Sequence, residues 1–313
     1  QGNTQLLCGF RQFALPYFSS MEVSDKSRVY EAWATSRLRV VVATTAFGMG
    51  IDKPDVRFVV HHTMSRTLEG YYQQVGRAGR DGLPSFCVTM YNAVDAMFLS
   101  GVASTVSRST FESNRKMIKF MERVDVCKRK QLAEHFGDNQ LLAAIAARGS
   151  SPVFCCDSCS ATGEERPRML EATDAASAVV RILAETNKPA TVLQAASLFA
   201  GRQRKVFGVD ASLPKAPPEI AKSKHECESF VIQMILEGYL AQDVQSNRYS
   251  VNSYVQPSGK GRALVRGHGS FFYCFPAAVI VTSATAPAPT TPAPATLGKR
   301  KAPDPASGKR RAL

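Results

Sequence analysis

Residues 42–56 read VATTAFGMGIDKPDV, and this stretch decides the fold. It begins at the end of an apolar run and continues into a glycine-rich loop. Gly48 and Gly50 lack a Cβ atom, so the backbone there can approach a phosphate closely. Asp52 would lie at the carboxyl end of the strand, where open α/β sheets bind ligands. The loop predicts either a phosphate contact made by these three residues or only a tight turn from strand to helix.

Apolar runs rich in β-branched residues recur around this stretch, at residues 39–44, 56–61 and 85–91. Such continuous runs are typical of strands in a sheet that is buried on both faces. Between the last two runs, residues 67–74 have a helical pattern, and Thr67 is a suitable N-cap. Strands that alternate with helices predict an α/β fold with a parallel sheet.

A second string, YYQQVGRAGRDG at residues 71–82, carries two arginines three positions apart. Arg77 and Arg80 would share one helical face or lie at a helix end between glycines. A guanidinium is a rigid positive fork for phosphate, and an arginine placed on the transferring phosphoryl group lowers the barrier strongly. On the residues alone, an ATP-site role and a pair of solvated arginines are equally good interpretations.

Downstream of these strings the pattern turns helical, from residue 110 to 148, where Met117, Phe120, Met121 and Val124 recur at helical spacing. A small α+β domain is predicted after it. The expected elements are helices at 175–183, 191–200 and 223–237 and hairpin strands at 239–240 and 248–251. Three helices and a hairpin are the parts of a winged helix, a relative of the helix-turn-helix motif.

Four of the eight cysteines lie close together, at positions 127, 155, 156 and 159. The gap of two residues between Cys156 and Cys159 lets one turn of chain offer both thiolates to one ion. The sequence shows no signal-peptide pattern, and such a cluster then indicates a metal site more than a disulfide framework. Buried or redox-active thiols are the alternative.

The charge balance points to a polyanionic partner. The 313 residues carry 39 Lys and Arg against 26 Asp and Glu, a net charge of +13, which favours nucleic acid as the partner. Hydrophobic residues make up 44%, which excludes a chain that is disordered throughout. No apolar run approaches the roughly 20 residues that cross a bilayer, so no membrane partner is expected.

Part of this charge lies in an Ala/Pro-rich tail, residues 281–313, which we expect to be disordered. Two compact basic clusters, at residues 299–301 and 309–311, resemble a nuclear localisation signal. They predict a nuclear protein. The alternative is a solvated basic tail with loose affinity for nucleic acid.

The strings at 42–56 and 71–82 together resemble motifs V and VI of the RecQ family of superfamily 2 DNA helicases, in particular its Bloom-type eukaryotic members. The match is long and gap-free, although position 74 is Gln where the family usually has Glu. The resemblance implies a RecA-like second helicase lobe, a parallel sheet with flanking helices. Arg77 and Arg80 would then reach the γ-phosphate of ATP bound to a first lobe, as catalytic residues together with Gln73. Gln73 and Asp52 would couple the state of ATP to the grip on DNA.

Residues 127–137, CKRKQLAEHFG, and 155–159, CCDSC, are similar to the segments that open and close the zinc-binding subdomain of this family. The ligands that the resemblance implies are Cys127, Cys155, Cys156 and Cys159. Cys155 is the least certain of them in position, because adjacent cysteines can hold one ion only with backbone strain. The alternative is a three-cysteine site completed by His135, Asp157 or water.

Family members use the winged helix to bind duplex DNA, by basic and polar side chains along the phosphates. The resemblance implies DNA contacts at Thr44 and Thr45 in the lobe and at Lys222, Lys224 and Arg248 in the winged helix. Three further candidates are Lys260, Arg262 and Arg266. For each basic residue a solvated surface charge is the simpler interpretation. The predicted domains are the lobe at 1–108, the zinc-binding subdomain at 109–168, the winged helix at 169–280 and the tail at 281–313.

The resemblance covers residues 20–275. The sequence departs from the family in one segment that contacts nucleic acid and in the motifs that bind ATP. The family's Tyr-His-Ala-Gly appears as Tyr17-Phe18-Ser19-Ser20, which removes a contact to the nucleic-acid backbone. The 313 residues contain neither a Gly-x4-Gly-Lys-Ser/Thr phosphate loop nor an Asp-Glu-x-His box, so ATP and Mg²⁺ would be shared with a first lobe.

Two functions follow. The first is the carboxyl-terminal part of an ATP-dependent 3′–5′ DNA helicase, which unwinds duplex or structured DNA in repair or recombination and has proteins of those processes as partners. The second is a truncated, inactive fragment that binds DNA or a partner protein. In either case the chain alone is expected not to hydrolyse ATP.

Overall fold

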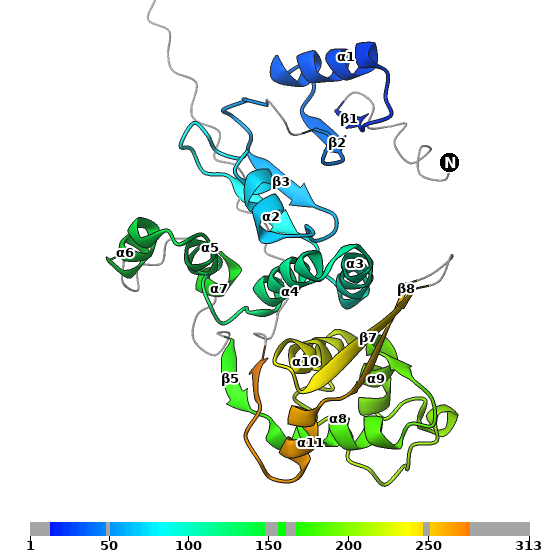
Figure 1. Ribbon diagram of the computed structural model, residues 1–313. Coiled ribbons are helices and arrows are strands. Elements are labelled where there is room, and N and C mark those ends of the chain that lie inside the picture. Colours follow the sequence, from blue (N-terminus) through cyan, green and yellow to red (C-terminus); the bar gives the residue numbers. More distant parts are fainter. Residues whose placement is uncertain (1–12, 48–50, 148–155, 161–166, 247–250, 276–313) are drawn as a thin grey trace, which may run out of the picture. The chain divides into compact units, whose positions relative to one another are not determined.

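The computed structural model describes residues 13–47, 51–147, 156–160, 167–246 and 251–275 (Figure 1). In chain order the helices and strands are β1 (Ala14–Tyr17), α1 (Val23–Ala34), β2 (Val40–Ala43), β3 (Phe58–His61), α2 (Leu68–Val75), β4 (Phe86–Thr89), α3 (Ala93–Val106), α4 (Arg108–Glu122), α5 (Lys128–Phe136), α6 (Asn139–Ala147), α7 (Asp157–Ser160), β5 (Arg168–Glu171), α8 (Thr173–Glu185), β6 (Ala190–Thr191), α9 (Val192–Phe199), η2 (Arg204–Phe207), α10 (Lys224–Leu236), β7 (Leu240–Ser246), β8 (Val251–Pro257), α11 (Gly259–Val265) and β9 (Phe272–Phe275). None of the described helices is both long and apolar enough to cross a membrane. The predicted tail lies outside the described residues.

The first strands of the chain, β1 and β2, form a parallel pair. α1 lies between them in sequence and buries Val29 and Trp33 in a small core with Leu38 and Ile51. Ile51 belongs to the glycine-rich stretch that decides the fold, so this core anchors the loop that carries Asp52. The strand predicted from the apolar run before that loop is confirmed.

A second parallel pair consists of β3 and β4, with Phe58 opposite Phe86. One face of this pair packs on α2, where the rings of His61 and Tyr71 lie 5.4 Å apart. The other face leaves Phe58 52% and Phe86 70% exposed. The prediction of strands buried on both faces is therefore wrong in this structure, because a helix covers only one face of the pair. Within the described residues no hydrogen bond joins β2 to β3, so the sheet consists of two separate parallel pairs.

The helical segment that follows begins with α3 and α4, which pack against each other (Figure 1). Ser107 separates them, and its hydroxyl accepts a hydrogen bond from the Thr110 amide at 3.0 Å to cap α4. Met117 and Phe120 are buried, which confirms the predicted helical face. α5 then begins directly after Cys127, so the start of this helix positions a candidate metal ligand.

The largest core of the chain is built around α10. Every residue from 227 to 235 is buried, so this helix is enclosed on all sides. At its centre the ring of Phe230 lies 5.2 Å from Phe199 and 4.8 Å from Tyr273. Capping boxes begin both α9 and α10, which explains why the predicted helices start where they do.

β7 and β8 form the predicted antiparallel hairpin, with Leu240 opposite Pro257, and β6 pairs with the other edge of β8. β7 is longer than predicted, and β8 begins at Val251, the last residue of the predicted second strand. The sequence pattern missed most of them because polar residues such as Gln242 and Asp243 interrupt the apolar pattern. Residues 247–250, which include most of the predicted second strand, lie outside the described residues.

Candidate functional site

The two strings that carry the predicted ATP chemistry lie against each other. The Gly79 amide donates to the Val56 carbonyl at 3.0 Å, and the Asp81 amide donates to the Pro54 carbonyl at 3.2 Å. The Arg57 guanidinium adds an ion pair with Asp81, at 2.6 and 2.7 Å to the two carboxylate oxygens. These contacts fasten the loop of residues 76–82 to residues 54–57.

Arg80 reaches back to the first string. Its Nη1 donates to Asp52 Oδ1 at 2.7 Å and to the Ile51 carbonyl at 3.0 Å. The Asp52 side chain is 84% exposed, while that of Arg80 is 37% exposed. An exposed carboxylate holds this arginine only weakly against water, so a more highly charged anion can compete for the guanidinium.

Arg77 lies beside Arg80 and just past the end of α2. The helix ends at Val75 with Gly76 as its C-cap, so both arginines lie beyond the helix, as the second of the two predicted arrangements requires. Partial burial and then the positive charge of Arg80 lower the pKa of Arg77. Two cations on one short loop attract a polyvalent anion such as a phosphate.

Gln74, the position where the sequence departs from the RecQ pattern, forms hydrogen bonds that connect two elements of the lobe. Its Oε1 accepts hydrogen bonds from Ser65 Oγ at 2.6 Å and from His61 Nε2 at 2.8 Å. These bonds tie α2 to the end of β3. Nothing in the sequence pattern indicated this role. Gln73, predicted as a coupling residue, is exposed on the same helix.

The predicted DNA-contacting threonines directly follow β2. The Thr44 amide donates to the Tyr17 carbonyl at 3.1 Å, which continues the pairing of β2 with β1. The side chains of Thr44 and Thr45 are exposed. They belong to the same string as Asp52 and lie three and two residues before Phe47, where the described segment ends. The predicted Gly48 and Gly50 lie outside the described residues.

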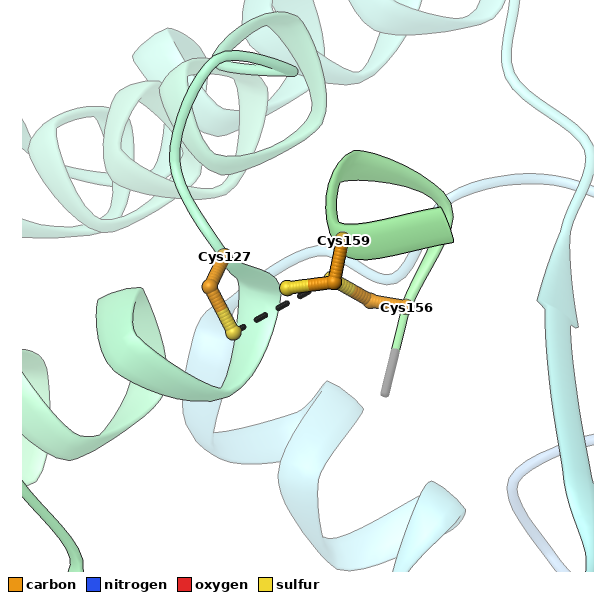
Figure 2. Close-up of side chains that lie close together, drawn as sticks. All are labelled: Cys127, Cys156 and Cys159. Atoms are coloured by element: carbon orange, nitrogen blue, oxygen red, sulfur yellow. Dashed lines mark hydrogen bonds between the residues drawn. The ribbon is translucent and has the colours of Figure 1, made fainter. Parts of the chain in front are cut away.

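Three of the four predicted metal ligands come together. The Sγ atoms of Cys127, Cys156 and Cys159 all lie within 4.8 Å of one another, and Figure 2 shows them pointing toward a common centre. The Sγ atoms of Cys156 and Cys127 are 4.0 Å apart. Thiolates around a tetrahedral zinc ion, with zinc–sulfur bonds of about 2.3 Å, are separated by about 3.8 Å. The spacing of these three sulfur atoms therefore fits zinc.

The surroundings of the cluster also suit thiolates. The Lys128 amide donates to Cys156 Sγ at 3.4 Å. Desolvation and the two neighbouring thiols raise the pKa of Cys159, so an ion would displace a proton from this thiol when it binds. Among the described residues no fourth side chain completes the group. His135, one alternative ligand, instead meets Glu69 Oε1 at 2.7 Å through its Nε2, and Cys155 lies outside the described residues.

The predicted basic DNA contacts have unequal surroundings. Lys222 and Lys224 are both exposed, just before the buried stretch of α10, which begins at Cys227. Lys224 Nζ lies 3.4 Å from Glu228 Oε1, which partly neutralises it. A pocket at this end of α10 is lined by both Lys224 and Arg202. Sequence reasoning missed Arg202, and Arg248 lies outside the described residues.

The three further basic candidates lie on or directly after α11. Lys260 Nζ donates to the Glu237 carbonyl at 2.8 Å and lies 4.0 Å from the centre of the Tyr239 ring. Arg262 donates to the Pro257 carbonyl at 2.6 Å. Both side chains therefore serve the fold, while Arg266 is exposed.

Comparisons with known proteins agree with this geometry. Residues 6–82 match the helicase conserved C-terminal domain, and residues 91–160 match the RecQ zinc-binding domain. The chain is 33% identical to a Caenorhabditis elegans protein described as an ATP-dependent DNA helicase Q1, over 79% of this chain and 37% of that protein. It is 32% identical to the RecQ-like DNA helicase blm-1 of the same organism, over 80% of this chain and 27% of the relative. It is 30% identical to the ATP-dependent DNA helicase Q1 of Rattus norvegicus, over 77% of this chain and 37% of that protein.

The fold and the site thus define the chain as a C-terminal helicase domain followed by a zinc-binding domain. The chain belongs to the RecQ family and corresponds to the carboxyl-terminal part of its helicases. It spans about a third of the length of the relatives that it matches. Those relatives include helicases of both the Q1 and the Bloom-like type, so the predicted Bloom-type subgroup stays a prediction.

The conformation of the arginine loop depends on Gly79, and its substitution gives a direct test. Gly79 has φ +66, and a Cβ atom there would lie 2.6 Å from Ser85 Oγ and 3.0 Å from the Leu83 carbonyl oxygen. Gly79→Ala should therefore lower the free energy of unfolding by more than the roughly 1–2 kcal/mol that a left-handed residue costs by itself. Gly82→Ala is the matched control, because Gly82 has φ +78 and open space around it. Urea unfolding measures both variants, and equal losses would contradict the close packing of the loop.

Proposed function

We propose that this chain provides the second motor lobe of an ATP-dependent DNA helicase of 3′–5′ polarity that acts in repair or recombination. The observation that carries the proposal is that the loop with Arg77 and Arg80 is fastened to the first string, where Asp52 holds Arg80. ATP and Mg²⁺ would be bound mainly by a lobe with a phosphate loop, and the two arginines would meet the γ-phosphate from this side. Such arginines stabilise the charge that spreads over the phosphoryl oxygens in the transition state.

The ion pair of Arg80 with Asp52 suggests how ATP would be coupled to DNA. Without nucleotide, Asp52 neutralises Arg80. A γ-phosphate has more charge than one carboxylate and would draw Arg80 toward itself, which releases Asp52. Asp52 lies in the same string as the exposed residues Thr44 and Thr45, the proposed DNA contacts. A shift of this string would therefore change the grip on DNA when ATP binds or is hydrolysed.

The same proposal assigns a structural zinc ion to Cys127, Cys156 and Cys159. The zinc-binding family match and the separations of the three sulfur atoms support it. A bound zinc ion would supply cross-linking and no chemistry of the reaction, because structural sites leave no position for substrate. Cys127 directly precedes α5, so its bond to the ion would fix the start of this helix against α7.

We further propose that residues 169–275 act as a winged helix that binds duplex or forked DNA. The burial of α10 on all sides means that this helix cannot enter a groove of DNA. The exposed positive charge at its amino-terminal end suits phosphate contacts instead. The residues of this contact are Arg202, Lys222 and Lys224. Contacts of this kind position DNA without reading its sequence.

A second function is favoured by one observation, the net charge of +13, which suits a polyanionic partner. In that case the chain would bind DNA or a partner protein without catalysis. The basic clusters of the tail favour the nucleus as the location for either function.

The purified chain should not hydrolyse ATP, because it has only the arginines of the site. A chimera with the amino-terminal part of the rat helicase Q1 should show DNA-stimulated hydrolysis. Arg80→Ala should reduce that rate by about a thousandfold, whereas Arg108→Ala, at an exposed arginine, should leave it unchanged. Hydrolysis by the chain alone that Arg80→Ala abolishes, or a chimera that ignores Arg80→Ala, would contradict the assignment.

Purified without chelator, the chain should contain about one zinc ion, measured by mass spectrometry of the metal. Cys159→Ser should lose the ion and lower the melting temperature, since structural zinc couples binding to folding. Cys87→Ser is the matched control, because Cys87 is exposed and lies outside the cluster. A metal content near zero in the parent chain refutes the zinc site.

DNA binding should persist without ATP chemistry. Affinity for forked DNA should fall at least about tenfold between 50 and 200 mM salt, because phosphate contacts release counterions. Deletion of residues 284–313 should retain the preference for duplex or forked DNA and remove only part of the salt dependence. Loss of all binding with the tail would assign DNA binding to the tail and not to the folded residues.

A further inference from the structure

A carboxyl group is enclosed where three parts of the chain meet. Glu122, the last residue of α4, is only 5% exposed. Its Oε1 accepts a hydrogen bond from the hydroxyl of Tyr91 at 2.5 Å, and its Oε2 accepts one from Ser229 Oγ. Tyr91 follows β4 and Ser229 lies in α10, so one side chain joins the lobe, the helical segment and the largest core.

The surroundings of this carboxyl group favour its neutral form. Desolvation raises the pKa of Glu122, and hydrogen bonds from Ser229, Tyr91 and Gln233 offset only part of that effect. His225 on α10 is the basic group that acts on it from that side. On the other side, desolvation and the charge of Glu122 raise the pKa of Tyr91 well above its ordinary value.

Among the described residues no other titratable neighbour forms an ion pair with Glu122, although the charge of Glu122 opposes the lowering of the pKa of Lys128 by burial. The hydroxyl of Tyr273 on β9 is buried, and its pKa is raised by burial first and by Glu122 among other groups. Lys128 on α5 donates its ammonium hydrogens to the carbonyls of Phe120, Met121 and Arg123. A buried carboxyl without an ion-pair partner is costly when ionised, so its retention here calls for a role.

The contacts on both sides of Glu122 show what it holds. Arg115, two turns earlier on α4, donates to the carbonyls of Ile235 and Leu236 at 3.2 Å each, at the end of α10. Lys119 adds an exposed ion pair with Glu237 at 3.0 Å. α4 therefore grips α10 at its end through solvent-accessible contacts and near its middle through Glu122.

The neighbouring helix α3 meets the hairpin in the same way. Ser100 Oγ accepts a hydrogen bond from Gln242 Nε2 of β7 at 3.2 Å. At Gly101 a Cβ atom would lie 2.5 Å from Val251 Cγ1 of β8, so only glycine permits this approach. The α3–α4 pair thus holds both α10 and the β7–β8 hairpin, and α10 leads directly into β7.

We propose that Glu122 is a positioning residue that fixes α10 and the β7–β8 hairpin to the α3–α4 pair. Through the hydroxyl of Tyr91 the same carboxyl group ties this assembly to the strand end of the lobe. The inference rests on the proposed function in one respect: α10, which Glu122 positions, begins with Lys224, one of the proposed DNA contacts. Movement of the lobe during an ATP cycle would then move α10 and the DNA contacts together with it.

Three variants of the full chain test the role. Glu122→Gln keeps an acceptor for Tyr91 and a donor for Ser229, and it does not titrate. Glu122→Leu removes the acceptors and leaves two buried hydroxyls without their partner. Glu112→Gln is the matched control, because Glu112 lies exposed on the same helix. Hydrogen exchange of α10 and of β7–β8 should accelerate about tenfold or more in Glu122→Leu and stay near the parent rate in the other two.

The pH dependence of the melting temperature distinguishes two roles of Glu122. The side chain either positions α10 through its hydrogen bonds or only fills space in the core. The folded pKa of Glu122 is raised above its ordinary value of 4.5, so the contribution of Glu122 to stability should fall as pH rises above that value, and Glu122→Gln should lack this change. The difference in melting temperature between Glu122→Gln and the parent should therefore widen from pH 5 to pH 8. A constant difference, or exchange in Glu122→Leu equal to that in Glu112→Gln, overturns the proposal.

If Glu122→Leu fails to fold, two other variants take its place in the test. Ser229→Ala and Tyr91→Phe each remove one of the two hydroxyls that donate to Glu122. Each should accelerate exchange on its own side of the joint, α10 or the end of β4. Binding of forked DNA is measured in parallel. Accelerated exchange without any change in DNA affinity would count against the proposed DNA contacts and leave the positioning role standing.

Discussion

The ion pair of Arg57 with Asp81 is the interaction on which the candidate site depends. It joins the start of β3 to the loop that carries the two predicted catalytic arginines, and two backbone hydrogen bonds reinforce it. Because Arg57 is partly buried, the pair loses less strength to water than a fully exposed one. Hydrogen bonding to Arg57 lowers the pKa of Asp81, which keeps this carboxylate charged at neutral pH. The loop can carry both Arg77 and Arg80, despite the repulsion of their charges, because the contacts of Asp81 and Gly79 with residues 54–57 hold it in place.

A second connection runs from the metal ligands to the same helix that leads into the arginines. Cys127 precedes α5, and residues at the far end of α5 contact α2. There His135 meets Glu69, and the ring of Phe136 lies 4.8 Å from that of Tyr72. The zinc-binding part therefore packs on α2 through the end of α5. Gln74 in turn joins α2 to β3.

The sequence predicted most of this arrangement where local patterns decide it. The strands at the apolar runs, the cap at Thr67 and the capped helices of the second half were all found as expected. Contacts that join distant residues could not be predicted, because no periodicity indicates that Glu122 meets Ser229 or that Gln74 meets His61. The exposed face of β3–β4 also escaped prediction, since an apolar run indicates which residues favour burial but not whether a covering element is present. In the same way the two-residue spacing paired Cys156 with Cys159 and the family resemblance added Cys127, as in the structure, yet the fourth ligand was left open.

The central claim is that Arg77 and Arg80 form one side of an ATP site that another lobe completes. It is tested most directly by a crystal structure of the chimera with the rat helicase lobe, bound to Mg²⁺ and a γ-phosphate analogue. Both guanidiniums should lie within about 3.2 Å of the oxygens of the analogue, and the contact of Arg80 with Asp52 should be lengthened. If Arg80 keeps its 2.7 Å contact with Asp52 while other residues of the chimera bind the phosphate, the claim is contradicted.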